Sequence, residues 1–167
     1  MIVLFLGSSI GNFEPAVAES FLQTVHQTLR LGDIFLLSTD LVKEVGRMVA
    51  AYDDPLGVTA AFNLNLLGRI NRELAADFDL RQFRHEARYD AVEQRIEMHL
   101  RSVIDQTISI NRNFTVKLQA GESIWTENSY KFHTDQVRLL SERAGFACKA
   151  QWVDSDWPFV QTVLEVI

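Results

Sequence analysis

The chain has 167 residues, of which 47% are hydrophobic and 23% are charged, and its formal net charge is −6 at pH 7. This length allows one ordinary domain or two small units that share a core, and the composition indicates a folded chain rather than a disordered one. A nucleic-acid partner is unexpected, because binding to a phosphate backbone needs clustered Lys and Arg, and the sequence has no such run.

The cysteine content and the start of the chain bear on its compartment. Cys148 is the single cysteine and cannot form an internal disulfide, which favours a reducing, cytoplasmic compartment. The apolar run over residues 2–6 has no basic segment before it and is too short for a signal peptide or a membrane span. We therefore expect no targeting segment and no membrane partner.

The first forty residues predict a strand–helix–strand unit. Residues 2–6 are typical of a parallel strand buried on both faces. A helical pattern begins near Pro15 and closes at Gly32, and a second apolar run covers residues 34–37. This order indicates α/β architecture. A strand buried on both faces needs neighbours, and the chain begins inside one, so we expect that an upstream part is missing.

The pattern changes near Lys43 and changes back near Phe132. Between these positions a helix is predicted over residues 58–74, and antiparallel strands follow. After them, Thr134 can cap a helix that ends before Gly145. The remaining predicted strands cover residues within 83–110, 114–118, 148–153 and 159–166.

Polar and glycine residues follow the first predicted strand. Ligands of open α/β sheets bind at the carboxyl ends of strands, so residues 7–13 stand where a small molecule is met. Gly7 and Gly11 permit a tight turn, and the amide of Asn12 can hold a carboxylate or an amine. A plain turn is an equally good interpretation. No Lys follows the glycines, so a phosphate-binding loop is not indicated.

Two other segments carry candidate binding residues. Tyr52 stands beside Asp53 and Asp54, a pair of carboxylates that can bind a metal or an ammonium group; the alternative is a solvated turn that starts the next helix. Glu127 and Ser129 lie two residues apart in an extended segment, so both point to one side, where they can grip a cationic or amine ligand. An ordinary polar strand end is the alternative.

The histidines and serines do not form a recognisable catalytic or zinc motif. No histidine pair has helical or Cys-linked ligand spacing, so we expect no metal site. No serine stands in a Gly-x-Ser-x-Gly context with ordered catalytic partners, which leaves hydrolase chemistry a minor alternative. The residues considered are His26, His85, His99, His133, Ser8, Ser9 and Ser129.

Five segments together resemble the family of SAM-dependent, histidine-specific methyltransferases, which includes the ergothioneine-pathway enzyme that trimethylates the α-amino group of histidine. The likeness runs in order through essentially the whole chain, and five blocks are far more specific than one. The segments are Phe5–Phe13, Ala51–Pro55, Val58–Asn65, Arg69–Leu74 and Thr126–Lys131.

The resemblance implies an α/β fold, the C-terminal half of a class I (Rossmann-like) methyltransferase sheet with an inserted α+β substrate-binding domain. Residues 1–42 and 132–167 then form part of the methyltransferase core, and residues 43–131 form part of the substrate-binding domain. The implied reaction is N-methylation of the α-amino group of histidine or a similar amino acid, with S-adenosyl-L-methionine as co-substrate.

The resemblance also implies roles for single residues. Asn12 and Tyr52 hold the amino-acid portion of the substrate, Glu127 and Ser129 bind the imidazole, and Met98 packs nearby. Gly7 is the one residue placed on the cofactor side. No catalytic base is assigned.

The chain departs from the family pattern at its start, which resembles the family's fourth strand. The glycine-rich loop that makes the main SAM contacts has no counterpart, so we expect this chain alone to transfer no methyl group. The alternative is a non-catalytic fragment that binds an amino acid or associates with itself through an exposed sheet edge.

Overall fold

The computed structural model describes residues 1–167, which divide into two compact units. The first unit comprises Met1–Lys43, Ala91–Arg95 and Asn128–Ile167. The second comprises Glu44–Asp90 and Ile96–Glu127. The chain therefore leaves the first unit twice and returns to it, so that each unit is assembled from segments distant in sequence.

The first unit is built on a four-stranded mixed sheet with the order β1-β2-β9-β8. Strands β1 and β2 are parallel, whereas β9 is antiparallel to both β2 and β8. The parallel pair places the carboxyl ends of β1 and β2 at the same edge of the sheet. The strands span Ile2–Phe5 (β1), Ile34–Asp40 (β2), Phe146–Val153 (β8) and Phe159–Val166 (β9).

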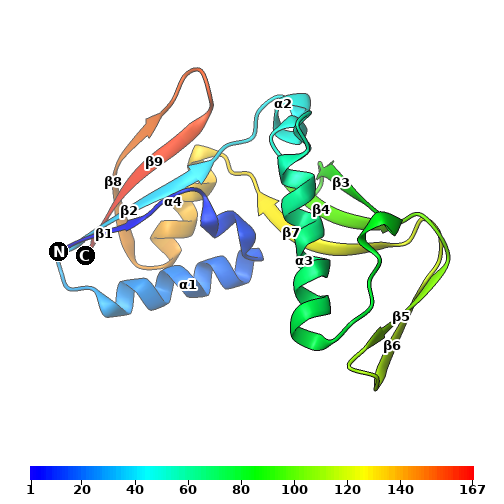
Figure 1. Ribbon diagram of the computed structural model, residues 1–167. Helices are drawn as coiled ribbons and strands as arrows, with labels where there is room; N and C mark the ends of the chain where they lie inside the picture. The colour runs from blue at the N-terminus through cyan, green and yellow to red at the C-terminus, as the bar shows by residue number, and fades with distance from the viewer. The chain divides into compact units, whose positions relative to one another are not determined.

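Helices α1 (Pro15–Thr28) and α4 (Thr134–Arg143) cover one face of this sheet (Figure 1). Alternate residues of β9 are buried, and those of β2 that share this face pack with them, as strand geometry requires. The resulting core includes Leu22, Phe35, Leu37, Val137 and Leu164, none of which is more than 1% exposed.

Strand β1 corrects one expectation, because it is not buried on both faces. Ile2 is 69% exposed and Leu4 is 57% exposed, whereas Val3 and Phe5 pack against the core on the helix side. The strand pairs only with β2, and both helices lie on one face of the sheet. A continuous apolar run indicates a strand that can be covered on both faces; which faces are covered depends on the rest of the fold.

The second unit packs helix α3 against a three-stranded sheet of order β3-β4-β7 and an antiparallel hairpin of β5 and β6. Its core includes Leu67 from the helix and Phe83, Leu100 and Ile108 from the strands. The helices are α2 (Val45–Ala50) and α3 (Val58–Leu74), with a short 3-10 turn, η2 (Leu80–Gln82). The strands are β3 (Phe83–Asp90), β4 (Arg95–Ser102) and β7 (Ser123–Tyr130), with a hairpin of β5 (Gln106–Ile110) and β6 (Phe114–Leu118). The last three residues of β7 belong to the first unit.

The start of helix α4 also differs from the sequence-based expectation. His133, not Thr134, is the N-cap residue, and the Gln136 side chain accepts a hydrogen bond from the His133 backbone N–H at 2.8 Å. This reciprocal arrangement is a capping box, in which a histidine takes the place of the usual hydroxyl residue. None of the helices combines the length and the apolar character needed to cross a lipid bilayer.

Candidate functional site

The turn after β1 carries Asn12 and is fixed by a hydrogen bond to β2. Gly7 (φ 76°) and Ser8 (φ 58°) both adopt left-handed backbone conformations, which reverse the chain into the 3-10 helix η1 (Ser9–Asn12). Ser8 is buried, and its Oγ accepts a hydrogen bond from the backbone N–H of Asp40 at 2.9 Å. Asn12 ends η1 and is exposed.

Gly11 lets this turn pack directly on the backbone of β7. A Cβ atom at Gly11 would lie 2.8 Å from the carbonyl oxygen of Tyr130 and 3.4 Å from its nitrogen. Both are backbone atoms, which cannot move aside as a flexible side chain does. Asn12 and Ser129 each lie one residue from this contact, so the first unit holds these two predicted site residues on neighbouring segments.

Gly11→Ala is therefore expected to destabilise the chain, by about 1–3 kcal/mol, the usual cost of overpacking. Gly68→Ala is the matched control, because a Cβ there meets only ordinary contacts, the nearest at 3.7 Å, inside helix α3. That control should stabilise the chain by up to about 1 kcal/mol, since alanine favours helix over glycine. Urea unfolding measures both, and equal effects of the two substitutions would contradict the close packing at Gly11.

A buried cluster of charged side chains stands at the ends of β2 and β7. The side chain of Lys131 is 0% exposed, and its Nζ lies 3.0 Å from Asp40 Oδ2. Lys43, 3% exposed, also pairs with Asp40 and lies 4.6 Å from the centre of the Trp157 ring. Lys131 Nζ further donates a hydrogen bond to Ser129 Oγ at 2.7 Å. Ser129 is thus linked to the carboxylate that ends β2.

Side chains on the opposite side of β7 contact Glu14, the residue before helix α1, and form a second polar cluster. Asn128 donates to Glu14 Oε1 at 3.0 Å, and the Tyr130 hydroxyl donates to Glu14 Oε2 at 2.6 Å. Arg95 donates to the same hydroxyl at 2.6 Å. Burial and the hydrogen bond to Glu14 raise the pKa of Tyr130, and Arg95 opposes this shift. Asn128 and Tyr130 therefore face Glu14, while Ser129 and Lys131 face the Asp40 cluster.

In the second unit, Tyr52 is held in place through its backbone. His85 Nε2 lies 2.7 Å from the Tyr52 carbonyl oxygen, so this nitrogen carries the proton and donates it. His85 Nδ1 then accepts from the buried Asn63 side chain at 3.0 Å. This chain of contacts joins the turn after α2 to helix α3 and strand β3.

The carboxylates beside Tyr52 have different roles. Asp54 accepts hydrogen bonds from the backbone N–H groups of Thr59 at 2.8 Å and Val58 at 3.1 Å, in the first turn of α3. These two bonds, that to Thr59 first, lower the pKa of Asp54 to about 2. Asp54 thus starts the helix, as the solvated-turn interpretation of this segment supposed. Asp53 is exposed.

Glu127 lines a hollow of about 260 Å³ in the second unit, together with residues of α3. Asn63 lines the same hollow and also binds His85, which holds Tyr52. Asn63 therefore connects the surroundings of Glu127 with the segment of Tyr52. Met98 is 4% exposed, and its carbonyl oxygen accepts a hydrogen bond from Thr126 at 2.9 Å.

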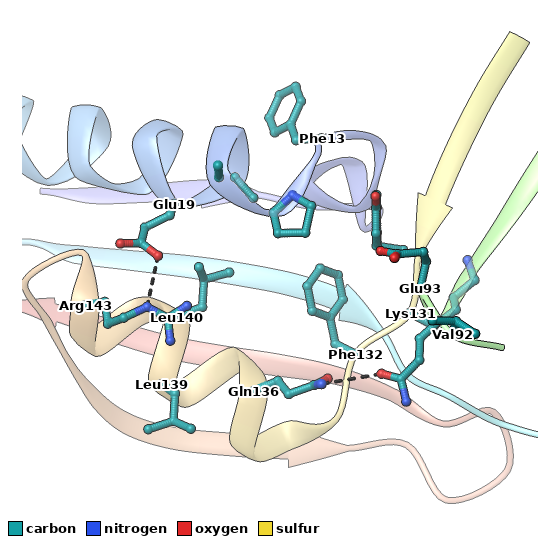
Figure 2. Close-up of a pocket in the computed structure, with 15 residues that line it drawn as sticks. Phe13, Glu19, Val92, Glu93, Lys131, Phe132, Gln136, Leu139, Leu140 and Arg143 are labelled. Atoms are coloured by element: carbon teal, nitrogen blue, oxygen red, sulfur yellow. Dashed lines mark hydrogen bonds and ion pairs between the residues drawn. The ribbon is translucent and has the colours of Figure 1, made fainter. Parts of the chain in front are cut away.

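The first unit contains a cavity of about 440 Å³ between α1, α4 and the segments around residues 92–94 and 130–132 (Figure 2). A Glu19–Arg143 ion pair of 2.9 Å crosses from α1 to α4 at this cavity. None of the predicted acceptor residues lines it. Its polar lining residues include the Glu19–Arg143 pair, Glu93, Gln94, Lys131 and Gln136.

The structure thus assigns the predicted residues to two groups. Gly7, Asn12 and Ser129 belong to the first unit, and Tyr52, Met98 and Glu127 belong to the second. Sequence reasoning missed three residues that support them, namely Asn63, His85 and Lys131. Asn63 and Lys131 stand within two of the five matching segments, whereas His85 lies outside all five. Each has a partner distant in sequence, which no local pattern reveals.

Comparisons with known proteins agree on the family and fold. Residues 1–166 match the model of a family described as histidine-specific methyltransferase, SAM-dependent. The histidine N-alpha-methyltransferase of Mycolicibacterium smegmatis is 48% identical over 154 residues, which are 92% of this chain and 48% of that protein. The same-named protein of Mycobacterium tuberculosis is 45% identical over 159 residues, 95% of this chain and 50% of that protein.

Among solved structures, the CcbJ methyltransferase from Streptomyces caelestis superposes with a TM-score of 0.52 at 9% identity. The superposition covers 99% of this chain and 60% of that one, and it shows an α/β methyltransferase fold. The chain spans about half the length of the two mycobacterial proteins that it matches.

Proposed function

This chain belongs to the SAM-dependent, histidine-specific methyltransferase family, and we propose that it forms the amino-acid acceptor part of a histidine Nα-methyltransferase. In this proposal residues 1–42 and 132–167 are part of the methyltransferase core, and residues 43–131 are part of an inserted substrate-binding domain. The observation that carries the proposal is the packing of Gly11 on Tyr130, which holds Asn12 and Ser129 on neighbouring segments. The lone thiol of Cys148 supports a cytoplasmic location.

The proposed chemistry is an in-line displacement by a neutral amine, for which positioning supplies most of the rate enhancement. Asn12 and Tyr52 hold the amino-acid end of histidine, while Glu127 and Ser129 hold its imidazole ring. The exposed amide of Asn12 can orient the amine, and no covalent intermediate on the protein is required. The proton of the amine passes to water or a nearby polar group.

S-adenosyl-L-methionine supplies the methyl group in this family. The residues of this chain fit the acceptor side of that reaction rather than the cofactor side. The glycines after β1 lie in a turn that packs on β7, and no glycine-rich loop follows a parallel strand elsewhere in the sequence. Gly7, exposed at the end of β1, remains the one residue that we place toward the cofactor.

A second candidate function is association through strand β1, with or without amino-acid binding. The exposed apolar side chains of Ile2 and Leu4, at an edge strand with one pairing partner, favour it. Light scattering of the chain over a range of concentrations measures this association. A mass that stays monomeric at every concentration would exclude it.

The proposed acceptor site is tested by titrating the chain with L-histidine and with L-alanine, followed by nuclear magnetic resonance. Histidine is expected to bind and alanine not, because only histidine offers a ring to Glu127 and Ser129. Glu127→Gln should weaken histidine binding by about 10–100-fold, the range for a hydrogen bond to a charged group.

Asn128→Ala is the matched control for Glu127→Gln. Asn128 is adjacent in sequence but faces Glu14, so its loss should change histidine affinity by less than about threefold. Equal binding of histidine and alanine, or equal losses from the two substitutions, would contradict the acceptor site.

A further inference from the structure

The cavity between helices α1 and α4 has the size and the lining of a small-molecule site. Its volume of about 440 Å³ lies in the range of ligand pockets, and every residue that lines it belongs to the first unit. Figure 2 shows the ion pair of Glu19 and Arg143 at one end, Glu93 at the other, and Phe132 and Leu140 between them. None of the residues proposed for the acceptor site lines this cavity.

Helix α4 lines the cavity with one face, two turns long. Gln136, Leu139, Leu140 and Arg143 all line it, and their spacing of three, four and seven residues places them on one side of a helix. Leu140 is 8% exposed and Leu139 is 44% exposed, so this wall is apolar from its buried floor to its open rim. The seven-residue step from Gln136 to Arg143 rises about 10 Å along the helix axis. A saturated chain of about eight carbon atoms, with bonds of about 1.5 Å, extends nearly as far.

The opposite wall is apolar, and the far end is polar. Helix α1 contributes Ala16 and the buried Ala18, whose side chains reach little beyond the helix backbone. At the far end, the Gln136 amide donates to the Gln94 side chain at 3.4 Å. The exposed residue Glu93 lines the same end. Its carboxylate disfavours a negatively charged ligand group there, since like charges repel.

Arg143 provides positive charge at the near end. Its Nε donates to Glu19 Oε2 at 2.9 Å, which is the one hydrogen bond that this guanidinium makes. A guanidinium presents five N–H donors in a rigid, planar fork, so its two terminal nitrogens still have donors to offer. The edge between these nitrogens matches a carboxylate, which binds there through two parallel hydrogen bonds. The Arg143 side chain is 57% exposed, so a ligand from solvent can reach it.

We propose that this cavity binds an amphipathic carboxylate, an aliphatic acid of about eight carbon atoms, with its carboxylate on Arg143 and its chain along Leu140 and Phe132. The charges set the direction of the ligand, because Arg143 attracts the carboxylate at one end and Glu93 repels it at the other. The apolar walls between these ends cover the chain. This site does not depend on the proposed function, since it shares no residue with the acceptor site.

The experiment titrates the 167-residue chain with octanoate, followed by nuclear magnetic resonance of the methyl groups of Leu139 and Leu140. Octanoate is expected to bind at least about tenfold more tightly than butanoate, because each further CH₂ group placed against the walls is removed from water. Octylammonium has the same chain and the opposite charge. It should bind about tenfold or more weakly than octanoate, because it cannot accept from Arg143.

Two substitutions separate the contact with the ligand from the ion pair. Arg143→Met keeps an apolar side chain and removes the charge, so it should weaken octanoate binding about tenfold, the lower end for a hydrogen bond to a charged group. Glu19→Gln also breaks the ion pair but keeps Arg143, so octanoate should bind as tightly as before or more tightly. Arg138→Met is the matched control, because Arg138 pairs with Glu142 on the same helix outside the cavity. That control should change the affinity by less than about twofold.

A substitution that fills the cavity tests the place of binding. Ala16 is exposed in the first turn of α1, so Ala16→Phe should leave the fold intact and abolish octanoate binding. The proposal is overturned if octanoate does not bind saturably, or if octylammonium binds as tightly. Equal effects of Arg143→Met and Arg138→Met, or unchanged binding to Ala16→Phe, would overturn it as well, because the acid would then adhere elsewhere on the surface.

Discussion

Asp40→Asn is expected to destabilise the chain by about 3–5 kcal/mol, the usual loss when one member of a buried ion pair is removed. The substitution keeps the size of the side chain and removes its charge. Lys131 and Lys43, 0% and 3% exposed, would then remain in a buried environment without the carboxylate that neutralises them. Urea unfolding followed by circular dichroism measures the loss.

Two further variants separate the buried charge from a general effect of substitution. Glu73→Gln removes an exposed ion pair with Arg69, whose side chain is 65% exposed, and should cost no more than about 0.5 kcal/mol. Adding Lys131→Met to Asp40→Asn removes one uncompensated charge, so the double variant should be more stable than Asp40→Asn alone. If Asp40→Asn lowers the free energy of unfolding no more than Glu73→Gln does, the buried ion pairs of Asp40 do not stabilise the chain as expected.

The sequence predicted much of the fold because helical and strand periodicity are local properties. The helix over Val58–Leu74 and the strand over Phe159–Val166 have the bounds expected from their patterns. The errors concern features that depend on distant parts of the chain. Strand β1 is exposed on one face because both helices lie on the other face of the sheet. His133 is the N-cap of α4, and the side chain that pairs with its backbone N–H belongs to Gln136, three residues later.

The sequence names candidate site residues but not the contacts that support them. The resemblance identified Asn12, Glu127 and Ser129 from short blocks of sequence. The contact from Lys131 to Asp40 joins the residue after β7 to the last residue of β2, and that from His85 to Tyr52 spans 33 positions. Such pairs depend on how the chain folds back on itself, and one sequence without its structure carries no signal for them.

The 167-residue chain alone is expected to yield no methylated histidine from S-adenosyl-L-methionine, because the proposed function places its residues on the acceptor side. Joining it to the part of the Mycolicibacterium smegmatis relative that lies outside the match should provide the cofactor side. This chain and the relative are 48% identical over the 154 residues that the joined protein would exchange.

The most direct test is mass spectrometry of the products that this joined protein forms from histidine and S-adenosyl-L-methionine, beside the intact relative and the chain alone. We expect histidine methylated on its α-amino group from the joined protein and from the relative, and none from the chain alone. A folded joined protein that binds S-adenosyl-L-methionine yet yields no methylated histidine, while the relative does, would contradict the assignment of this chain as a histidine acceptor.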